Sequence, residues 1–472
     1  MTINCLFIIP PSEQKKQFVR LIDCSHEAKA NYLWQPNDYL IISSYLKKND
    51  KAFLIDATCD HLSDRIFFKK LNDFKSNDIN LIFFSTGSAC YYSDIKYFEQ
   101  IRKIFNDTTI VVLGDVFVEE NFRKDILDKD ADAILYQPYN LDLNNISQLR
   151  FQKNNNNLEG EIEGIIINSS SYPFLEKKKK LSIIESDIPR HQLFKKKYSW
   201  PFLLTKNFTT ITTMWGCTYS CSYCTSGVMH PISRTNESIL KEIAFIKELG
   251  FKEIQFFDKV FGVPKPERKI LLKDIVNKNL TIPFSCYFHP SMYDPEFLDL
   301  MKAAGCHSII IGIDSVNLEQ LALYNRKVSK YTLDKLIDHA DKIGINVCAD
   351  FIIGLPHETE EDIYKTIEYS KKIKIDFASY NIAAPLPGSS FRKDAISDGK
   401  INNTDLEDTL NSNFSSKLIS AEKLLEIRKK ANFQFYFRPY MFFRRLKRLR
   451  SLEHFYIQFT QMIGILKHNI FR

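Results

Sequence analysis

Residues 214–227 read Met-Trp-Gly-Cys-Thr-Tyr-Ser-Cys-Ser-Tyr-Cys-Thr-Ser-Gly. They place Cys217, Cys221 and Cys224 in a C-x3-C-x2-C array directly after an expected strand, residues 209–214. Three thiolates on one short loop can hold three corners of an iron–sulfur cubane, whereas a ferredoxin-type cluster or a structural zinc site needs four ligands. The missing fourth ligand would leave one iron open to a substrate or cofactor.

A structural zinc site is the alternative for this loop, with His230 as a fourth ligand. No second C-x2-C pair lies nearby to support it. The other seven cysteines lack cluster spacing, and we assign none of them chemistry. Ten cysteines scattered through a long chain that shows no secretory signal argue against a disulfide framework. They predict a reducing compartment, so we expect a cytoplasmic protein.

Outward from the cysteines, apolar strand patterns alternate with helical ones such as residues 238–249 and 295–304. Six βα repeats predict a partial (β/α)6 barrel whose chemistry lies at the carboxyl ends of its strands. The expected strands are residues 209–214, 253–257, 282–286, 308–313, 346–353 and 377–382.

The first half of the chain shows a separate βα series, which predicts a doubly wound parallel sheet of the Rossmann-like or flavodoxin-like kind. Its expected strands are residues 3–9, 52–56, 79–85, 109–114 and 131–136. The α/β chain then divides into a first domain over 1–140, a linker over 141–194, the barrel over 195–400 and an α-helical extension over 401–472. Four asparagines at 154–157 and four lysines at 177–180 mark the linker.

Charge excludes two classes of protein. The net charge of +7 on 472 residues, with 44% hydrophobic residues, does not fit a strongly basic polymer-binding protein or a disordered acidic one. Residues 437–472 hold eight basic residues and one acid, which accounts for the whole excess.

The array resembles that of the radical SAM superfamily, in which an aromatic residue precedes the last cysteine, as Tyr223 does here. The resemblance implies a 4Fe-4S cluster whose open iron chelates S-adenosylmethionine and cleaves it reductively. Further likenesses lie at the expected strand ends, in Gln255-Phe-Phe-Asp258, in Ile311-Gly-Ile-Asp-Ser315 and in Asp350-Phe-Ile-Ile-Gly-Leu-Pro356.

The resemblance implies a set of S-adenosylmethionine contacts. Asp258, or a nearby carbonyl, would accept from the amino group, Arg326 would grip the carboxylate with its planar fork, and Asp350 would bind the ribose. The full set is Tyr223, Asp258, Asp314, Ser315, Arg326, Asp350 and Pro385. Taken singly, Asp314 and Asp350 could equally cap a helix or pair with a lysine.

The first half resembles the cobalamin-binding domain that precedes the barrel in one branch of this superfamily, through Tyr39-Leu-Ile-Ile-Ser-Ser-Tyr and the strand ending Ile55-Asp-Ala57. The implied nucleotide-tail contacts are Ser85, Thr86, Ser88 and Gly114. No D-x-H-x-x-G occurs, so a histidine-ligated cobalt is not expected. A scaffold domain without cobalamin is the alternative.

The resemblance implies an enzyme that methylates, cyclises or otherwise modifies an unactivated carbon of a small-molecule or lipid-like substrate, with a flavodoxin-type or ferredoxin-type electron donor. A tRNA methylthiotransferase would need three further cysteines in the first domain and a terminal β-barrel, and neither pattern is present. The alternative from another class is a nucleic-acid or membrane binding protein with a structural or redox-sensing cluster. No nucleic acid partner is expected. Cys24 and residues 26–34 are candidate substrate contacts, since the long connection after the first strand would face the barrel.

Residues 433–472 combine eleven aromatic residues, ten of them within 433–459, with the basic cluster at 444–450. Two interpretations stay open. The helices can close the side of the barrel with Phe and Leu inward and Arg in water, or they can lie in a bilayer interface as a peripheral membrane contact.

Overall fold

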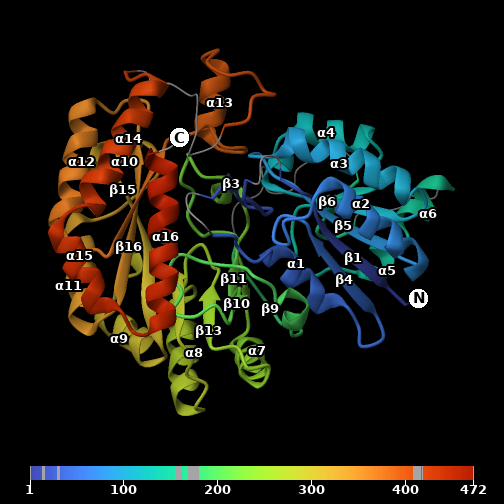
Figure 1. The fold of residues 1–472 in the computed structure, drawn as a ribbon, viewed down its shortest axis with the longest axis horizontal. Coiled ribbons are helices and arrows are strands. Elements are labelled where there is room, and N and C mark those ends of the chain that lie inside the picture. Colours follow the sequence, from blue (N-terminus) through green and yellow to red (C-terminus); the bar gives the residue numbers. More distant parts are fainter. Residues whose placement is uncertain are drawn as a thin grey trace.

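Two six-stranded sheets form the frame of the molecule, and a group of C-terminal helices follows the second sheet (Figure 1). The computed structural model describes residues 2–12, 16–28, 32–155, 162–167, 180–407, 416 and 418–470. The lysines at 177–179 and the asparagines at 156–157 lie outside the described residues.

The first sheet confirms the doubly wound prediction. Its strand order is β4-β1-β5-β6-β7-β8, with the first five strands parallel and β8 antiparallel to β7. Every residue of β5, β6 and β7 is buried, as expected for strands covered by helices on both faces. The strands are β1 Asn4–Ile9, β4 Lys51–Asp56, β5 Leu81–Ser85, β6 Thr109–Leu113, β7 Ala133–Leu135 and β8 Ile165–Ile166, and the helices are α1 Asn37–Ile42, α2 Asp64–Asp73, α3 Tyr91–Ile104, α4 Glu120–Asp128, α5 Leu143–Ile146 and α6 Leu149–Asn154. A small hairpin, β2 Phe18–Arg20 with β3 Ser25–Glu27, lies between β1 and α1.

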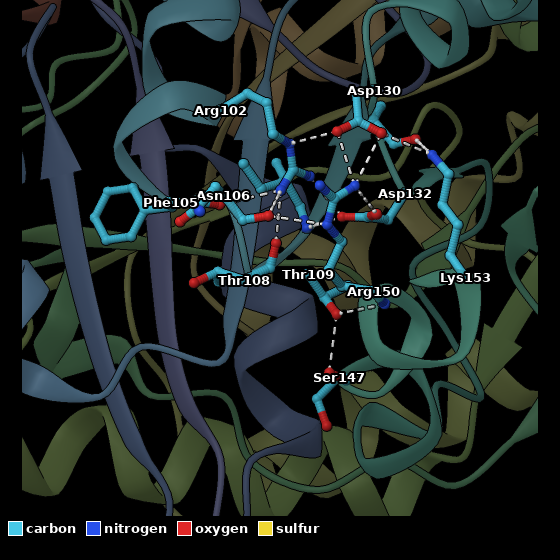
Figure 2. A network of polar contacts seen from close by, with 12 residues as sticks. Arg102, Phe105, Asn106, Thr108, Thr109, Asp130, Asp132, Ser147, Arg150 and Lys153 are labelled. Atoms are coloured by element: carbon cyan, nitrogen blue, oxygen red, sulfur yellow. Dashed lines mark hydrogen bonds and ion pairs between the residues drawn. The ribbon is translucent and has the colours of Figure 1, made fainter. Parts of the chain in front are cut away.

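Part of the expected linker packs on this sheet. Strand β8 pairs with β7, and Ile146 and Leu149 lie in the core of the first sheet. Figure 2 shows how α6 is attached: Arg150 and Lys153 bind the Asp130 carboxylate at 2.8 and 3.0 Å, within the network that also joins Arg102 to Asp132. Asp132 directly precedes β7, so this network lies at the amino ends of the strands, opposite the edge that binds ligands in such folds.

The second sheet confirms the six predicted βα repeats. Its six strands run parallel in the order β10-β13-β14-β15-β16-β17, which makes an open barrel wall. The strands are β10 Phe208–Ile211, β13 Glu253–Phe256, β14 Phe284–Tyr287, β15 Cys306–Asp314, β16 Asn346–Ile353 and β17 Phe377–Ile382, and the helices are α7 Asn236–Glu248, α8 Lys265–Asn277, α9 Pro295–Ala303, α10 Leu318–Leu323, α11 Lys330–Ile343 and α12 Glu360–Lys372.

The run expected as one strand at 209–214 is divided into β10 and β11 (Met214–Trp215). The Asp258 carboxylate accepts hydrogen bonds from the backbone of Thr213 at 2.6 Å and Met214 at 3.2 Å, which turns the chain there. Strand β11 then joins a small sheet with β12 Ile232–Arg234 and β9 Ser182–Ile184. The loop between β11 and β12 carries the three cysteines.

The C-terminal part is helical, as predicted. It comprises α13 Ser390–Ser397, α14 Ala421–Tyr436, α15 Pro439–Arg448 and α16 Leu452–Ile470. Helix α14 packs on the barrel through Leu424, Ile427 and Phe435, and the Tyr436 hydroxyl donates to the Ala378 carbonyl at 2.7 Å. Among the described residues, no helix is both long and apolar enough to span a bilayer.

The two sheets meet through a buried polar and aromatic junction. Gln35 accepts from the Thr210 backbone at 2.8 Å, and Asn37 donates to the Thr212 hydroxyl at 2.8 Å. Trp34 packs against Trp200, with ring centroids 4.3 Å apart. The core of the first sheet therefore continues into the β10 side of the barrel.

Candidate functional site

The three cysteines of the loop surround one cavity. Cys217, Cys221 and Cys224 form no disulfide and line a cavity of about 320 Å³ at the carboxyl ends of the second sheet. The loop begins at Gly216, whose φ of 74° favours glycine and where a Cβ would lie 2.3 Å from the His230 carbonyl oxygen. Within the described residues, no three His, Cys, Asp or Glu side chains are grouped as ligands of a single ion.

A charged network closes one wall of the cavity. The Arg326 guanidinium binds the Asp314 carboxylate with Nε 2.6 Å from Oδ2 and donates to the Gly312 carbonyl at 2.5 Å. The Tyr223 hydroxyl donates to the same carboxylate at 2.8 Å. Asp314 lies at a register shift between β15 and β16, with φ of 64°. Burial raises the pKa of the Cys221 thiol, and the Arg326 charge opposes that rise.

Several predicted site residues line this cavity together. They are Cys217, Cys221, Tyr223, Cys224, Asp314, Arg326 and Asp350. Arg326 and Asp314 also bind each other. The resemblance implied each of them as a ligand contact but did not predict this ion pair.

Three other predicted residues do not line the cavity. Asp258 is fully buried and binds the backbone before the cysteine loop, and burial raises its pKa to about 6. Ser315 binds Glu358 at 3.2 Å on the other side of the strand. Pro385 accepts from Arg392 at 3.3 Å, while its neighbours Ala384 and Leu386 reach the cavity. These three therefore support the wall.

Sequence reasoning missed two polar residues that follow strand ends. Lys259, after β13, lines the cavity and binds Asp23 of the first domain at 3.1 Å. His289, after β14, stacks on Tyr219 of the cysteine loop with ring centroids 3.9 Å apart. Its position just beyond a barrel strand was the feature that could have revealed it.

The imidazole of His289 is neutral in this setting. Burial, together with the charge of Arg326, lowers its pKa to about 3. Its Nδ1 accepts from the Ser291 backbone at 3.2 Å, and its buried Nε2 has no hydrogen-bond partner among the described residues. With Nδ1 as the acceptor, Nε2 carries the proton and can donate to a ligand.

The residues expected to hold a corrinoid are engaged inside the first domain. Ser85 donates to the Arg20 carbonyl at 2.9 Å, Thr86 to Asp94 at 3.0 Å, and Ser88 to Asp115 at 2.9 Å. Gly114 lies against the Thr86 carbonyl. All four are buried or enclosed, so they offer no free group to a nucleotide tail in this structure.

The hairpin of β2 and β3 covers the carboxyl edge of the first sheet. Arg20 forms a buried two-point ion pair with Asp94, at 2.8 and 3.0 Å. Ser25 lies so close to Gly87 that a Cβ there would be 2.3 Å from the Ser25 hydroxyl oxygen. Any large ligand at this edge would have to displace the hairpin.

The candidate substrate segment faces the barrel, as expected. Cys24 lies 3.5 Å from the Lys259 ammonium, and Trp34 contacts Phe257, with ring centroids 5.3 Å apart. Residues 29–31 lie outside the described part of the chain.

Known proteins are similar to the part of the chain that forms the cavity. The radical SAM superfamily matches residues 211–370 of the chain, which include all three cysteines. An uncharacterized methyltransferase of Pyrococcus horikoshii is 24% identical over 93% of each chain. Bacteriochlorophyllide d C-12(1)-methyltransferase of Chlorobaculum tepidum is 26% identical, over 49% of this chain and 50% of its own length.

Solved structures share the whole architecture. The radical S-adenosylmethionine methyltransferase TsrM of Kitasatospora setae, with tryptophan and a SAM analogue bound, superposes with a TM-score of 0.67 over 99% of this chain and 98% of its own, at 14% identity. The cobalamin-dependent S-adenosylmethionine radical enzyme OxsB, with aqua-cobalamin and S-adenosylmethionine bound, superposes with a TM-score of 0.63. The match covers 99% of this chain and 71% of OxsB, also at 14% identity. At these identities the likeness shows the fold.

Proposed function

We propose that the chain belongs to the radical SAM superfamily, in the branch with an N-terminal cobalamin-binding-like domain, and that it is a methyltransferase-type enzyme. It would cleave S-adenosylmethionine reductively and modify an unactivated carbon of a small-molecule substrate. The methyl-transfer part rests on its similarity to the two methyltransferases named above.

One observation carries the proposal. Three cysteines that form no disulfide and the Arg326–Asp314 pair surround a single cavity at the carboxyl ends of a parallel sheet. At about 320 Å³, the cavity lies within the usual range of small-ligand sites. The donor set fits a three-cysteine cluster, because none of the three cysteines forms a disulfide and, among the described residues, no fourth cysteine lines the cavity.

The chain's own residues would hold and orient the ligands. Cys217, Cys221 and Cys224 would bind a 4Fe-4S cluster, which when bound supplies the electron that breaks the sulfonium bond. Arg326 would donate to the ligand carboxylate, and the Nε2 proton of His289 offers a second donor. The apolar wall would exclude water from the reacting group. That wall includes Val260, Phe288, Ile310 and Ile352.

Cobalamin is proposed as the second cofactor because TsrM and OxsB have been solved with it bound. Ser85, Thr86, Ser88 and Gly114 do not fit that role in this structure, because their polar groups are engaged internally. Corrinoid binding would require the β2–β3 hairpin to leave the edge of the first sheet. We therefore derive no step through cobalamin.

Anaerobic reconstitution tests the proposal. The chain, reconstituted with iron and sulfide, should form 5'-deoxyadenosine from S-adenosylmethionine and dithionite. The triple variant Cys217→Ala, Cys221→Ala, Cys224→Ala should form none and lose the iron-sulfur absorbance. Cys5→Ala, which removes a buried thiol from β1, is the matched control and should keep both.

Two results would count against the proposal. Wild-type iron content in the triple variant would remove the cluster assignment. A reconstituted cluster that neither binds nor cleaves S-adenosylmethionine would favour a structural or redox-sensing cluster instead. Corrinoid bands that persist through gel filtration would test the cobalamin part separately.

A further inference from the structure

Helix α15 is amphipathic, and its arginines face the protein. Arg444 binds Asp376, with Nε 2.7 Å from Oδ1, and Arg448 binds Asp341 at 2.7 Å. The Arg445 guanidinium lies 4.6 Å from the centre of the Phe377 ring. With buried Met441 these three form a stripe at i, i+3, i+4 and i+7, which is one face of a helix. The expected packing, with Phe and Leu inward and Arg in water, is therefore wrong for this helix.

The opposite face of α15 is apolar and open to solvent. Phe442 is 67% exposed, Phe443 61% and Leu446 54%. The neighbouring helices α14 and α16 also expose aromatic side chains, and we call the whole set the aromatic face. It comprises Phe433, Phe437, Tyr440, Phe442, Phe443, Leu446, Leu452, Phe455, Tyr456 and Phe459, each at least 44% exposed. Helices α14, α15 and α16 lie at one side of the molecule in Figure 1.

Exposed side chains of this size rarely gather on a monomer without a function. Residues 429–452 contain eight basic residues and no acid, of which Arg444, Arg445 and Arg448 face the protein. Lys430, Lys447 and Arg450 are exposed at this surface. Aromatic side chains with a basic rim are typical of helices that lie in the interface of an anionic bilayer.

We propose that the aromatic face is a docking surface for an anionic membrane. The helix axis would lie along the bilayer plane, with the aromatic rings among the acyl chains and the exposed cations at the lipid phosphates. The inward arginines fix the orientation, since their pairing with Asp341 and Asp376 holds α15 on the barrel with its apolar face outward.

Charge argues against a second copy of the chain as the occupant. A symmetric dimer through this face would place the exposed cations of one subunit opposite those of the other, and like charges at an interface cost several kcal/mol. An anionic lipid surface satisfies the apolar and the charged part together. The proposal does not depend on the reaction catalysed in the cavity.

Vesicle flotation of the full-length protein tests the docking surface. The wild type should float with phosphatidylcholine–phosphatidylglycerol vesicles at low salt, and less with phosphatidylcholine alone. The variant Phe442→Ser, Phe443→Ser, Leu446→Ser should lower the partition coefficient at least about tenfold. Phe151→Ser is the matched control, because this α6 side chain is 71% exposed on the other domain. It should bind as the wild type does.

A charge variant separates the two parts of the surface. Lys430→Gln, Lys447→Gln, Arg450→Gln should weaken binding to anionic vesicles by about fivefold for each cation that reaches the lipid. Lys69→Gln, Lys70→Gln, Lys124→Gln, all exposed on the first domain, should change it little. Circular dichroism should show each variant folded.

Three outcomes would overturn the proposal. One is a wild type that does not float at low salt. Another is equal flotation of the triple serine variant. The third is a dimer that light scattering detects without lipid and that the serine substitutions dissociate. Such a dimer would show that the aromatic face binds a second copy of the chain.

Discussion

Arg326 is the residue on which ligand recognition in the cavity should depend most. Its Nε lies against the Asp314 carboxylate, and its Nη2 donates to the Gly312 carbonyl. Neither of these two contacts uses Nη1. Arg326→Lys keeps the charge but loses the planar fork, so affinity for S-adenosylmethionine should fall by about tenfold or more. Equilibrium dialysis of the reconstituted protein measures this.

The control for that variant is Lys327→Ala, an exposed neighbour. Iron content should be unchanged in both proteins. Equal affinity of Arg326→Lys and wild type would show that the ligand carboxylate binds elsewhere in the cavity.

Asp115 should make the protein less stable as the pH rises. Burial raises its pKa to about 7, against the two hydrogen bonds from Ser88. Between about pH 4 and pH 7 the folded protein therefore binds more protons here than the unfolded chain, and this group's contribution to the free energy of unfolding falls with rising pH. Asp115→Asn should remove that slope and stabilise the protein at pH 8 by roughly 1–3 kcal/mol.

Urea unfolding at pH 5 and pH 8 measures the difference, with the exposed Asp107→Asn as control. If the free energy of unfolding still falls with rising pH in Asp115→Asn, other buried carboxyl groups cause that fall. Asp38 and Glu358, whose pKa values burial also raises to about 7, are the candidates.

Motifs located strand ends but not the direction of each side chain. Asp314 and Ser315 are neighbours, and so are Asp258 and Lys259, yet one of each pair lines the cavity. Asp258, Lys259 and Ser315 follow the ends of β13 and β15, and Asp314 has a φ of 64°, so the local turn and not the strand pattern sets the direction of each side chain. Apolar runs that alternate along the chain with helical segments predicted both sheets. Each run is continuous because the strands of a parallel sheet are buried on both faces.

At the scale of elements, the periodicity of α15 predicted an amphipathic helix but not which face turns inward. The partners of its arginines, Asp341 and Asp376, lie on other elements far back in the chain, so no local pattern reveals them. The division of β10 from β11 has the same origin, since Asp258 binds Thr213 from the next strand. Long-range polar pairing is what sequence reasoning missed.

Removal of Arg444 should release α15 from the barrel. Its partner Asp376 has a side chain only 3% exposed, so Arg444→Ala would leave a buried carboxylate with the Val347 backbone hydrogen bond at 2.9 Å and the Arg448 cation no nearer than 3.7 Å. Loss of one partner of a buried pair costs about 3–5 kcal/mol. Hydrogen exchange of the α15 amides should therefore become much faster.

The control is Lys447→Ala, which removes a cation from the outward face of the same helix. It should leave the exchange of α15 unchanged. Slow exchange in Arg444→Ala would mean that Met441 and the stacked Arg445 suffice to hold the helix.

At the scale of the whole molecule, the cavity of the barrel and the first domain meet at one ion pair. Lys259 comes from the end of β13 and Asp23 from the loop between β2 and β3, and both are largely buried. Burial alone would lower the pKa of Lys259, but the adjacent Asp23 carboxylate outweighs it and raises that pKa. The pair therefore couples the position of the first domain to the wall of the site.

A double-mutant cycle on Lys259→Met and Asp23→Asn should give a coupling free energy of roughly 1.5–3 kcal/mol in urea unfolding, because both groups lose water in the folded state. Lys196 and Asp60, 2.6 Å apart, offer a matched but more hydrated pair between the same two parts of the chain, since the Asp60 side chain is 35% exposed and that of Asp23 only 6%. Their cycle should give less than about 1 kcal/mol, since solvent screens the interaction. Equal coupling in the two cycles would mean that Lys259 and Asp23 are as well hydrated as a surface pair, and that the first domain sits on the barrel through its aromatic junction alone.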